Sequence, residues 1–534
     1  MTMDVLHDDL IEEVASRLDL REPNKRALQT LAYDLNQYFE VEGKEGPREV
    51  VIDAATGMGK TYILAGAIEY LARLGTRNFV VIAPGRTILE KTLANFTPGH
   101  PKSLLGGMEV EPVLITAENF TNASVRAEME DEGKVKLFVF TAQSLLRPTT
   151  NLGRRTRKFQ EGLGKALYEH LDDLDDLVVF ADEHHVYHGP KFSDAVRGLT
   201  PRALIGLTAT PDEKALKKAG IPIIFRYPLA AAIAEGYVKT PVIVGRKDDL
   251  SDARTKIADG LRLLRAKEQA IEAYCDQTGA ERVVPVMLIV AQTIEDADEY
   301  ERLLNDPSFM NGEWGGDKVL TVHSSAPDEA LAALEKVEEP DSPVRVIISV
   351  GMLKEGWDVK NVYVIASMRA SISDVLTEQT LGRGLRLPWG AYTGVGLLDT
   401  LEVVAHERYD ELLRRAKVIN ERFIDHETRL VEKTTESGEA VPALEEQEVS
   451  LEVIPSAGES GDPTAEQDAG DPAMAPGGAA TGADGTGLPA GTPTIGSVEE
   501  RHEEAEAEAA AARQVLVIRD GSPTIELPVM RLQK

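Results

Sequence analysis

The chain has 534 residues, of which 58 are basic, 89 are acidic and 43% are apolar, and its formal net charge is −31. A length of this order predicts about three domains of 100–200 residues each. The single cysteine, Cys275, excludes an intrachain disulfide and a zinc site of the multi-cysteine kind.

The acidic balance argues against nucleic-acid binding when it is considered alone. The charge is uneven, however: residues 431–512 hold 19 acidic and 2 basic side chains, and so carry −17 of the −31. The residues outside 431–512 carry the remaining −14 and are therefore still acidic overall. A local basic groove is possible on such a protein, but the sequence does not show one. No apolar run reaches the roughly 18 residues of a membrane span, and the acidic, amphipathic N-terminus does not resemble a secretory signal. These features predict a cytoplasmic protein without membrane partners.

Residues 1–48 repeat apolar side chains at helical spacing and are predicted to form an N-terminal helical segment. Short apolar, β-rich runs then alternate with longer helical stretches. We predict a first domain over 49–235 and a second over 236–430, with a charged helical spacer near 251–281. Continuous apolar strands separated by helices indicate parallel sheets covered on both faces, and therefore two α/β domains in tandem. The predicted strands are 50–55, 79–84, 112–116, 136–142, 177–183, 203–210, 283–292, 318–324, 344–350 and 361–368.

The composition changes after about Asp425, and residues 431–512 are interpreted as an acidic, low-complexity linker. Its segment 455–497 consists mainly of Pro, Gly, Ala, Ser, Thr and Asp and is predicted to be disordered. An acidic surface helix is expected over 499–513. Residues 513–534 resemble two strands around an Asp-Gly turn and are predicted to form a C-terminal β-hairpin.

The strongest motif is AATGMGKT, residues 54–61, between a buried strand and a helical stretch. Glycines in such a loop let backbone N–H groups turn toward phosphate oxygens, at the positive end of the following helix. Lys60 is predicted to reach the β- and γ-phosphates of a nucleotide, and Thr61 to ligate Mg²⁺. Ala54 replaces the glycine that opens the general pattern. The predicted nucleotide contacts in the loop are Thr56, Gly57, Met58, Gly59, Lys60 and Thr61.

Two adjacent carboxylates, Asp182 and Glu183, end another apolar strand in VVFADEHH. In a parallel sheet this end faces the ligand crevice. Asp182 is predicted to hold Mg²⁺ and Glu183 to activate the attacking water. The alternative is an acidic, solvated turn. His184 and His185 follow without a partner at ligand spacing, which favours hydrogen bonding over a metal site.

Two further segments suggest nucleotide chemistry. Thr208 and Thr210, in LTATP, offer hydroxyls near the same crevice. In TEQTLGRGLR, one helix face would present Gln379, Arg383 and Arg386, and arginines from a second domain stabilise the charge that builds during phosphoryl transfer. The alternative is a solvated basic face. The loop KEGWDVK is predicted to sense the nucleotide, with contacts from Gly356 and Asp358.

The order of these motifs resembles superfamily-2 DEAD/DEAH-box helicases, and within them the helicase part of type III restriction endonuclease subunits. The resemblance rests on AATGMGKT, APGRTILEK, ADEHH, LTATP, YPLAAAIAEGYVKTP, MLKEGWDVKNV and EQTLGRGLR, and covers roughly residues 26–388. It implies two RecA-like domains, ATP and Mg²⁺ as cofactors, and Lys60, Thr61, Asp182 and Glu183 acting with the second-domain Gln379, Arg383 and Arg386. It also implies an adenine contact from Gln29, a bacterial or phage origin, and a nucleic-acid partner, DNA in preference to RNA. The implied nucleic-acid contacts are Pro84, Gly85, Arg86, Thr141, Ser144, Thr293 and His323.

The sequence departs from this family after the two predicted RecA-like domains, where the restriction subunits carry a nuclease domain. Residues 431–534 contain no Asp…Glu-x-Lys constellation, so DNA cleavage is not predicted. The predicted function is an ATP-dependent DNA helicase or translocase. A double-strand remodeller and an ATP-switched assembly subunit of a restriction or defence complex stay open as alternatives. The acidic tail could bind protein partners, imitate nucleic acid, inhibit the motor, or act only as a solubilising linker.

Overall fold

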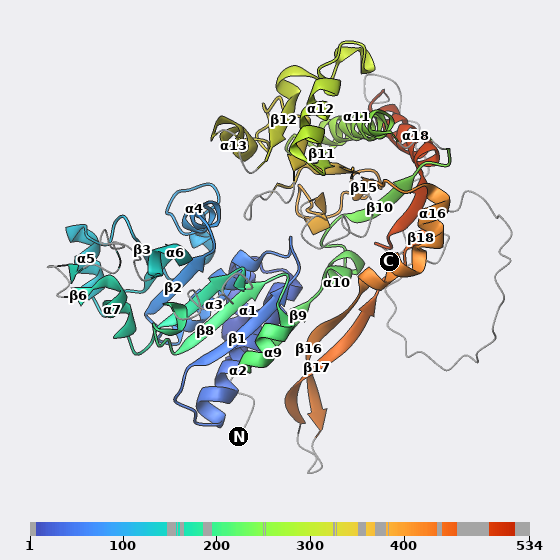
Figure 1. Ribbon diagram of the computed structural model, residues 1–534. Helices are drawn as coiled ribbons and strands as arrows, with labels where there is room; N and C mark the ends of the chain where they lie inside the picture. The colour runs from blue at the N-terminus through green and yellow to red at the C-terminus, as the bar shows by residue number, and fades with distance from the viewer. Residues whose placement is uncertain are drawn as a thin grey trace. The chain divides into compact units, whose positions relative to one another are not determined.

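The computed structural model of the chain shows two compact units (Figure 1). The first contains the chain up to Leu229 together with Asp425–Val449, and the second contains most of the rest. The residues that the structure describes are 7–146, 156, 159–160, 165–184, 195–248, 250, 252–323, 326, 328–350, 359–368, 381–382, 384–434, 440–456 and 491–517.

The first unit is built on a seven-stranded sheet in the order β3-β4-β2-β7-β8-β1-β9. Every neighbouring pair in it is parallel. The central strands β2 and β8 are buried along their whole length, as expected for apolar strands with helices on both faces. The sheet strands are β1 (Arg48–Ala54), β2 (Asn78–Ala83), β3 (Val113–Thr116), β4 (Lys136–Thr141), β7 (Val178–Asp182), β8 (Ala203–Thr208) and β9 (Ile223–Tyr227).

Helices precede these strands and connect them, and a parallel sheet requires such connections. In chain order they are α1 (Asp8–Arg17), α2 (Glu22–Asn36), α3 (Lys60–Arg73), α4 (Arg86–Asn95), α5 (Ala123–Glu130), α6 (Ala142–Leu145), α7 (Leu167–Asp172) and α9 (Glu213–Ala219), with a small antiparallel pair β5 (Phe159–Gln160) and β6 (Lys165–Ala166). The predicted N-terminal helical segment is thus observed as α1 and α2.

The second unit is built on an eight-stranded sheet in the order β12-β13-β11-β14-β15-β10-β19-β18, and again every neighbouring pair is parallel. Its strands are β10 (Thr240–Gly245), β11 (Val286–Ala291), β12 (Val319–Val322), β13 (Val346–Val350), β14 (Val362–Ser367), β15 (Thr400–Val404), β18 (Ile454–Pro455) and β19 (Thr494–Ser497). Its helices are α10 (Leu229–Ala234), α11 (Ala253–Thr278), α12 (Ile294–Leu304), α13 (Asp328–Glu335), α16 (Tyr409–Arg414), α17 (Ala416–Asn420) and α18 (Val498–Val517). The predicted fold class, two parallel α/β domains in tandem, is confirmed.

Each apolar run that the sequence predicts as a strand forms one, and α11 is the predicted charged spacer helix. The strands β9, β10 and β15 were not predicted. Arg226 interrupts the apolar run of β9 and Glu402 that of β15, whereas β10 is a short apolar run that begins with Thr240 and Pro241.

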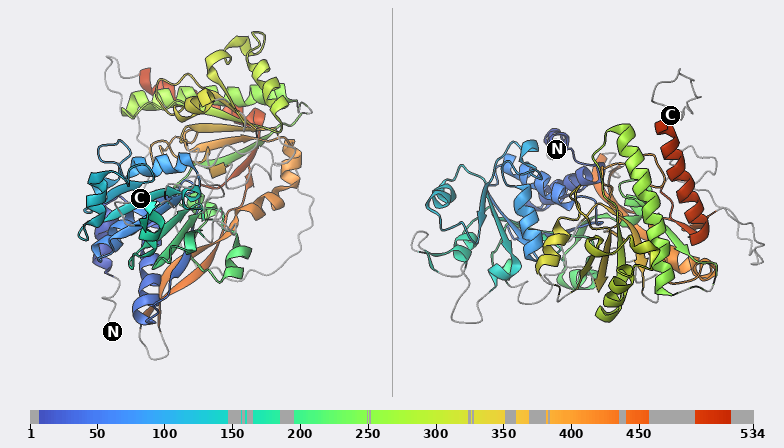
Figure 2. Two further views of the ribbon diagram at one scale, coloured as in Figure 1. Left: turned by 60° about the vertical axis from the view of Figure 1, so that its left-hand side comes forward. Right: turned by 90° about the horizontal axis from the view of Figure 1, so that it is seen from above.

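The predicted linker 431–512 contains helices and strands in several parts, so the linker interpretation does not hold over its whole length. Strand β19 joins the sheet beside β10, and α18 lies along α11, as Figure 2 shows. The expected acidic helix is therefore present, but one face of it is buried: Val498, Ala505 and Ala509 belong to the core. Helix α18 also continues to Val517, so the first residues of the predicted C-terminal hairpin are helical. Most of the segment predicted to be disordered, 457–490, and residues 518–534 lie outside the described residues.

A two-stranded ribbon, β16 (Ile424–Thr434) with β17 (Ala440–Ser450), belongs to the first unit and is orange in Figure 1. It is held to the helix and sheet of that unit: the Tyr33 hydroxyl donates to the Pro442 carbonyl at 2.9 Å, and the Arg226 amide donates to Thr428 Oγ1 at 3.0 Å. Glu427, on the ribbon, is buried and pairs with Arg26. None of the helices that could be searched is both long and apolar enough to span a bilayer.

Candidate nucleotide site

The loop between β1 and α3 has the backbone geometry of a phosphate-binding turn. Gly57 and Gly59 have φ angles of 90° and 87°, a left-handed region that glycine adopts without steric cost. Helix α3 begins at Lys60, directly after Gly59. The positive end of the helix and its unpaired N–H groups therefore lie where an anion would bind. Met58, between the two glycines, is buried.

The acidic pair lies at the end of β7, which is separated from β1 by the single strand β8. Glu183 Oε1 lies 3.5 Å from Lys60 Nζ, so the two motifs, 123 positions apart in the numbering, meet in one site. Burial and the neighbouring Glu183 raise the pKa of Asp182 to about 6, while Lys60 and a hydrogen bond from the Glu183 amide oppose the rise. Glu183 has a φ of 50°, a conformation that costs roughly 1–2 kcal/mol for a residue with a Cβ. Backbone strain of this kind is typical of functional positions.

The structure adds Asp53, at the end of β1, to the charged groups of this site. Its carboxylate lies 3.5 Å from Arg226 Nη1. Burial raises the pKa of Asp53 to about 7, with smaller upward effects from Asp425 and Glu213 and downward effects from Arg226 and Lys60. Asp53 was not predicted as a site residue, although a charged residue inside the apolar string VVIDAA was a signal for it.

Asn24, on α2, is a second residue of this site that was not predicted from the sequence. It is 2% exposed, and its Oδ1 has no hydrogen-bond partner among the residues that the structure describes. Its amide lies against the phosphate loop, because a Cβ built on Gly59 would come 3.1 Å from Asn24 Nδ2. Gln29, predicted to contact adenine, lies half-buried later on the same helix, and its role stays a prediction.

Part of the chain matches a known protein family. Residues 17–213, which contain the phosphate loop and the acidic pair, match the family described as type III restriction enzyme, res subunit. The predicted resemblance to the helicase part of these subunits is confirmed. We refer to residues 17–213 below as the Res-like region.

Individual relatives are similar over different lengths. The EcoPI Res subunit of Escherichia phage P1 is 43% identical over 96 residues, which is 17% of this chain and 10% of that protein. The probable HindVIP Res subunit of Haemophilus influenzae is 23% identical over 415 residues, 61% of this chain and 78% of that protein. A solved structure, the ATP-dependent type ISP restriction-modification enzyme LlaBIII bound to DNA, is 17% identical with a TM-score of 0.43, and the match covers 72% of this chain and 27% of that one. The chain thus spans far less than two thirds of the first of these relatives.

Within the Res-like region, His184 has a packing role. Its ring covers Gly206 on β8, where an added Cβ would come 2.5 Å from His184 Cγ. Its Nε2 lies 3.9 Å from Glu49 Oε1, and Glu49 also accepts two hydrogen bonds from Arg197 at 3.0 and 3.1 Å. No cluster of three metal-ligating side chains occurs among the residues that could be searched. His185 lies outside the described residues.

The hydroxyl residues of LTATP lie at the same sheet edge as the acidic pair. Thr208 is fully buried and pairs in register with Asp53, while its neighbour Leu207 pairs with Asp182. The Thr208 hydroxyl accepts a hydrogen bond from the Thr210 amide at 3.1 Å. This supports the expected placement of the threonines near the crevice.

The predicted nucleic-acid contacts follow the ends of four strands. In the Res-like region, Arg86 is exposed and its Nε donates to Glu90 at 2.7 Å, and Thr141 Oγ1 lies 2.8 Å from Ser144 Oγ. In the second unit, His323 follows β12, and the Thr293 hydroxyl caps α12 by accepting from the Asp296 amide at 3.1 Å. Thr293 therefore has a structural role of its own. Binding by any of these residues, including Pro84 and Gly85 after β2, stays a prediction.

The second-unit motif is described only in part. Arg386 is half-buried and follows a helical turn that ends near Gly384. Gln379 and Arg383, and the predicted nucleotide-sensing residues Gly356 and Asp358, lie outside the described residues. The predicted common face of Gln379, Arg383 and Arg386 therefore stays a prediction.

The raised pKa values of Asp53 and Asp182 predict how stability depends on pH. Both carboxyls hold a proton more strongly when folded than when unfolded, so the folded state loses stability as pH rises from about 4 to about 7. An Asp53→Asn variant removes this effect at one site. We expect the free energy of unfolding at pH 8 to increase by on the order of 2 kcal/mol, with little change at pH 4. Urea unfolding at both pH values measures this change in the free energy of unfolding. Equal effects of the substitution at pH 4 and pH 8 would contradict the prediction.

Proposed function

We propose that this chain hydrolyses ATP with Mg²⁺ and couples hydrolysis to movement on nucleic acid, with DNA preferred over RNA. The observation that supports this most strongly is the 3.5 Å approach of Lys60 to Glu183. It joins a phosphate-binding loop to the acidic pair of the Res-like region at one sheet edge. A site that combines this loop with an acidic pair can hydrolyse a nucleotide as well as bind it.

The residues present fit a magnesium nucleotide. The φ angles of Gly57 and Gly59 turn the loop backbone toward an anion at the start of α3. Asp182 is a carboxyl whose pKa is raised by burial and by a second acid, and adjacent buried carboxylates are costly unless a cation offsets them. Thr61 and Asp182 would hold Mg²⁺, which supplies charge neutralisation at the phosphates when it is bound.

Glu183 is the proposed general base. Its side chain lies at the end of β7, held in a strained backbone conformation that fixes its direction. In this structure it pairs with Lys60, and phosphate oxygens would compete for the Lys60 ammonium. Occupation of the loop would therefore leave the Glu183 carboxylate available to accept a proton from the attacking water.

In this proposal, Arg386 of the second unit stabilises the charge that develops on the transferred phosphate. Gln379 and Arg383, close to it in the sequence, have the same role. This assignment rests on the motif TLGRGLR. Arginines in this role raise the rate of phosphoryl transfer by about 10³–10⁵. The proposal covers the motor activity alone and assigns no DNA cleavage to these residues.

A Lys60→Ala variant tests the nucleotide chemistry. We expect the rate of phosphate release from ATP to fall by at least about 100-fold, because the lysine both binds the phosphates and stabilises charge at them. The wild-type rate should increase on adding single-stranded or duplex DNA, and less with RNA. A Lys102→Ala variant, on an exposed turn of the same unit, is the control for loss of a positive charge. Hydrolysis by Lys60→Ala at the wild-type rate would refute the site, and an ATPase insensitive to all three nucleic acids would refute the motor.

A further inference from the structure

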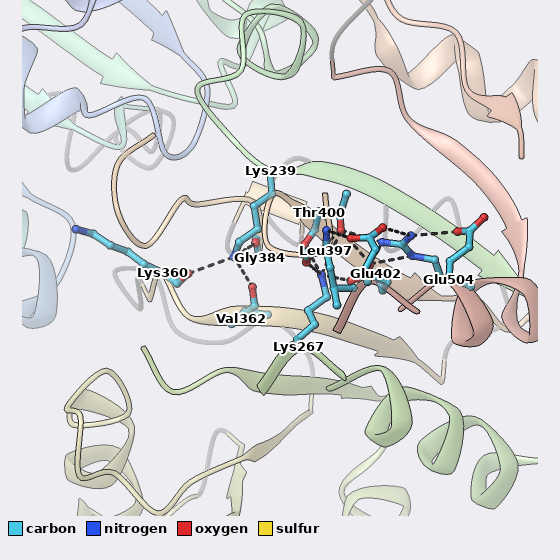
Figure 3. Close-up of polar contacts among 11 residues, drawn as sticks. Lys239, Lys267, Lys360, Val362, Gly384, Leu397, Thr400, Glu402 and Glu504 are labelled. Carbon is cyan, nitrogen blue, oxygen red and sulfur yellow. Dashed lines mark hydrogen bonds and ion pairs between the residues drawn. The ribbon is translucent and has the colours of Figure 1, made fainter. Parts of the chain in front are cut away.

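Lys239 is a fully buried lysine of the second unit whose amine points at three backbone carbonyls (Figure 3). Its Nζ donates to the carbonyls of Val362 at 2.7 Å, Gly384 at 3.1 Å and Lys360 at 3.2 Å. It also lies 3.9 Å from the centroid of the buried Tyr363 ring. An ammonium group has three N–H donors, so these three carbonyls satisfy all of them at once.

Burial of this charged amine is unfavourable because it removes the amine from water, so its presence in the core indicates a specific role. Burial and the charge of Lys267 lower the pKa of Lys239, whereas hydrogen bonds to carbonyls favour its protonated form. A methionine of similar volume would fill the same space without desolvating a charge. The lysine therefore acts by holding the backbone in position, because its three hydrogen bonds form only when two separate backbone segments, 360–362 and Gly384, are both in place.

The two segments that it joins belong to the second unit and lie at the ends of two predicted motifs, the nucleotide-sensing loop and TLGRGLR. Gly384 and Leu385 directly precede Arg386 in TLGRGLR, and the Lys239 amide adds a hydrogen bond to the Leu385 carbonyl at 2.6 Å. Lys360 and Val362 connect the predicted nucleotide-sensing loop to β14. Lys239 itself immediately precedes β10, so it holds the ends of both motifs against the start of one sheet strand.

We infer that Lys239 is a positioning residue that fixes the backbone before Arg386 relative to the end of the nucleotide-sensing loop, and thereby sets the catalytic placement of the arginine. The inference rests on the proposed function, because it gives Arg386 a task in hydrolysis. Displacing a reacting group by about 1 Å costs on the order of 100-fold in rate. Loss of Lys239 should therefore act on turnover, whereas the phosphate loop that binds the nucleotide belongs to the other unit.

The same unit contains a matched control. Lys267 is also fully buried, and its Nζ donates to the carbonyls of Leu397 at 2.6 Å and Thr400 at 2.7 Å and pairs with Glu402. These partners lie before and within β15 and are not part of either motif (Figure 3). A Lys267→Met variant removes a buried amine of the same size and stabilising role without releasing the backbone before Arg386.

The test compares Lys239→Met, Lys239→Gln and Lys267→Met in the full chain. We expect Lys239→Met to lower kcat for ATP hydrolysis by about 100-fold and to change the Kd for ATP by less than about threefold. Lys239→Gln, which keeps two N–H donors, should recover part of the loss. Lys267→Met should lower the thermal midpoint at least as much as Lys239→Met, yet keep kcat within about threefold of wild type. If the two lysine-to-methionine variants lower kcat equally, Lys239 is only a structural residue.

A double-mutant cycle with Arg386→Ala makes the test independent of stability. If Lys239 acts through Arg386, Lys239→Gln should slow turnover in the wild-type background and have no further effect on kcat in the Arg386→Ala background. Additive losses would overturn the inference. A failure of the proposed function is distinguishable: it would appear as absent ATP hydrolysis in the wild type, or as hydrolysis that Lys60→Ala leaves unchanged.

Discussion

A Glu183→Gln variant is expected to bind ATP with nearly wild-type affinity and to hydrolyse it about 10²–10⁴ times more slowly. The substitution keeps the size and hydrogen-bonding reach of the side chain but removes the carboxylate that would accept the proton of the attacking water, and a general base contributes a factor of this order. Affinity should be kept or should rise slightly, because Lys60 no longer has an anionic partner 3.5 Å away and is free for phosphate.

Fluorescent-nucleotide titration and phosphate release measure the two parts of this prediction separately. A Glu109→Gln variant is the control, since Glu109 pairs with Arg17 and Arg73 on the surface of the same unit. The assignment of Glu183 as the base does not survive a variant that hydrolyses ATP within tenfold of wild type. A variant with lost affinity and an unchanged kcat would instead make Glu183 a binding residue.

The sequence could predict Lys60, Asp182 and Glu183 because their signals are local. Each motif combines a buried apolar strand with a short polar string, and the carboxyl ends of parallel strands meet at one sheet edge. The structure supplies what spacing cannot, namely that β8 alone separates β7 from β1 and that Lys60 meets Glu183.

Other residues of the two units acquire their importance only through tertiary burial. Asn24 lies on an ordinary amphipathic helix, and it becomes notable because its side chain is buried against Gly59. Lys239 lies in YPLAAAIAEGYVKTP, a segment that carries part of the family resemblance but gives its lysine no chemical role, and only the fold brings three carbonyls around its amine. Neither environment is encoded in the neighbouring sequence.

The packing of the C-terminal helix could not be predicted for a related reason. The acids and alanines of 499–513 predicted a surface helix but did not show which face it buries, because alanine gives only a weak apolar stripe. Yet small side chains allow close packing, and Ala505 and Ala509 are buried with α11 alongside. Arg501 was one of only two basic residues in the supposed linker, and it reaches the fully buried Glu402 at 2.7 Å.

Truncation of the chain after residue 490 is therefore expected to unfold the second unit or nearly so. It removes β19 and α18, exposes the buried side of α11, and leaves Glu402 with Lys267 but without Arg501. Breaking a buried ion pair costs about 3–5 kcal/mol, and burial of Ile495 and Val498 contributes roughly 1.5–3 kcal/mol each. The combined loss approaches the roughly 5–15 kcal/mol by which a typical domain is stable.

A second deletion separates the folded segment from the stretch before it. Replacing residues 457–490 by a Gly/Ser linker of about ten residues keeps β18, β19 and α18, and it is long enough to return the chain from Pro455 to Thr494, which lie on adjacent strands. Urea unfolding should show a midpoint near wild type for this variant, and a collapsed or missing transition for the chain that ends at 490. If both variants unfold like the wild type, the packing of α18 on α11 does not stabilise the second unit. If only the linker variant is stable, its second sheet is intact, because Arg501 still neutralises the buried Glu402. The effect of the acidic stretch 457–490 on nucleic-acid-stimulated ATPase activity can then be measured in this variant.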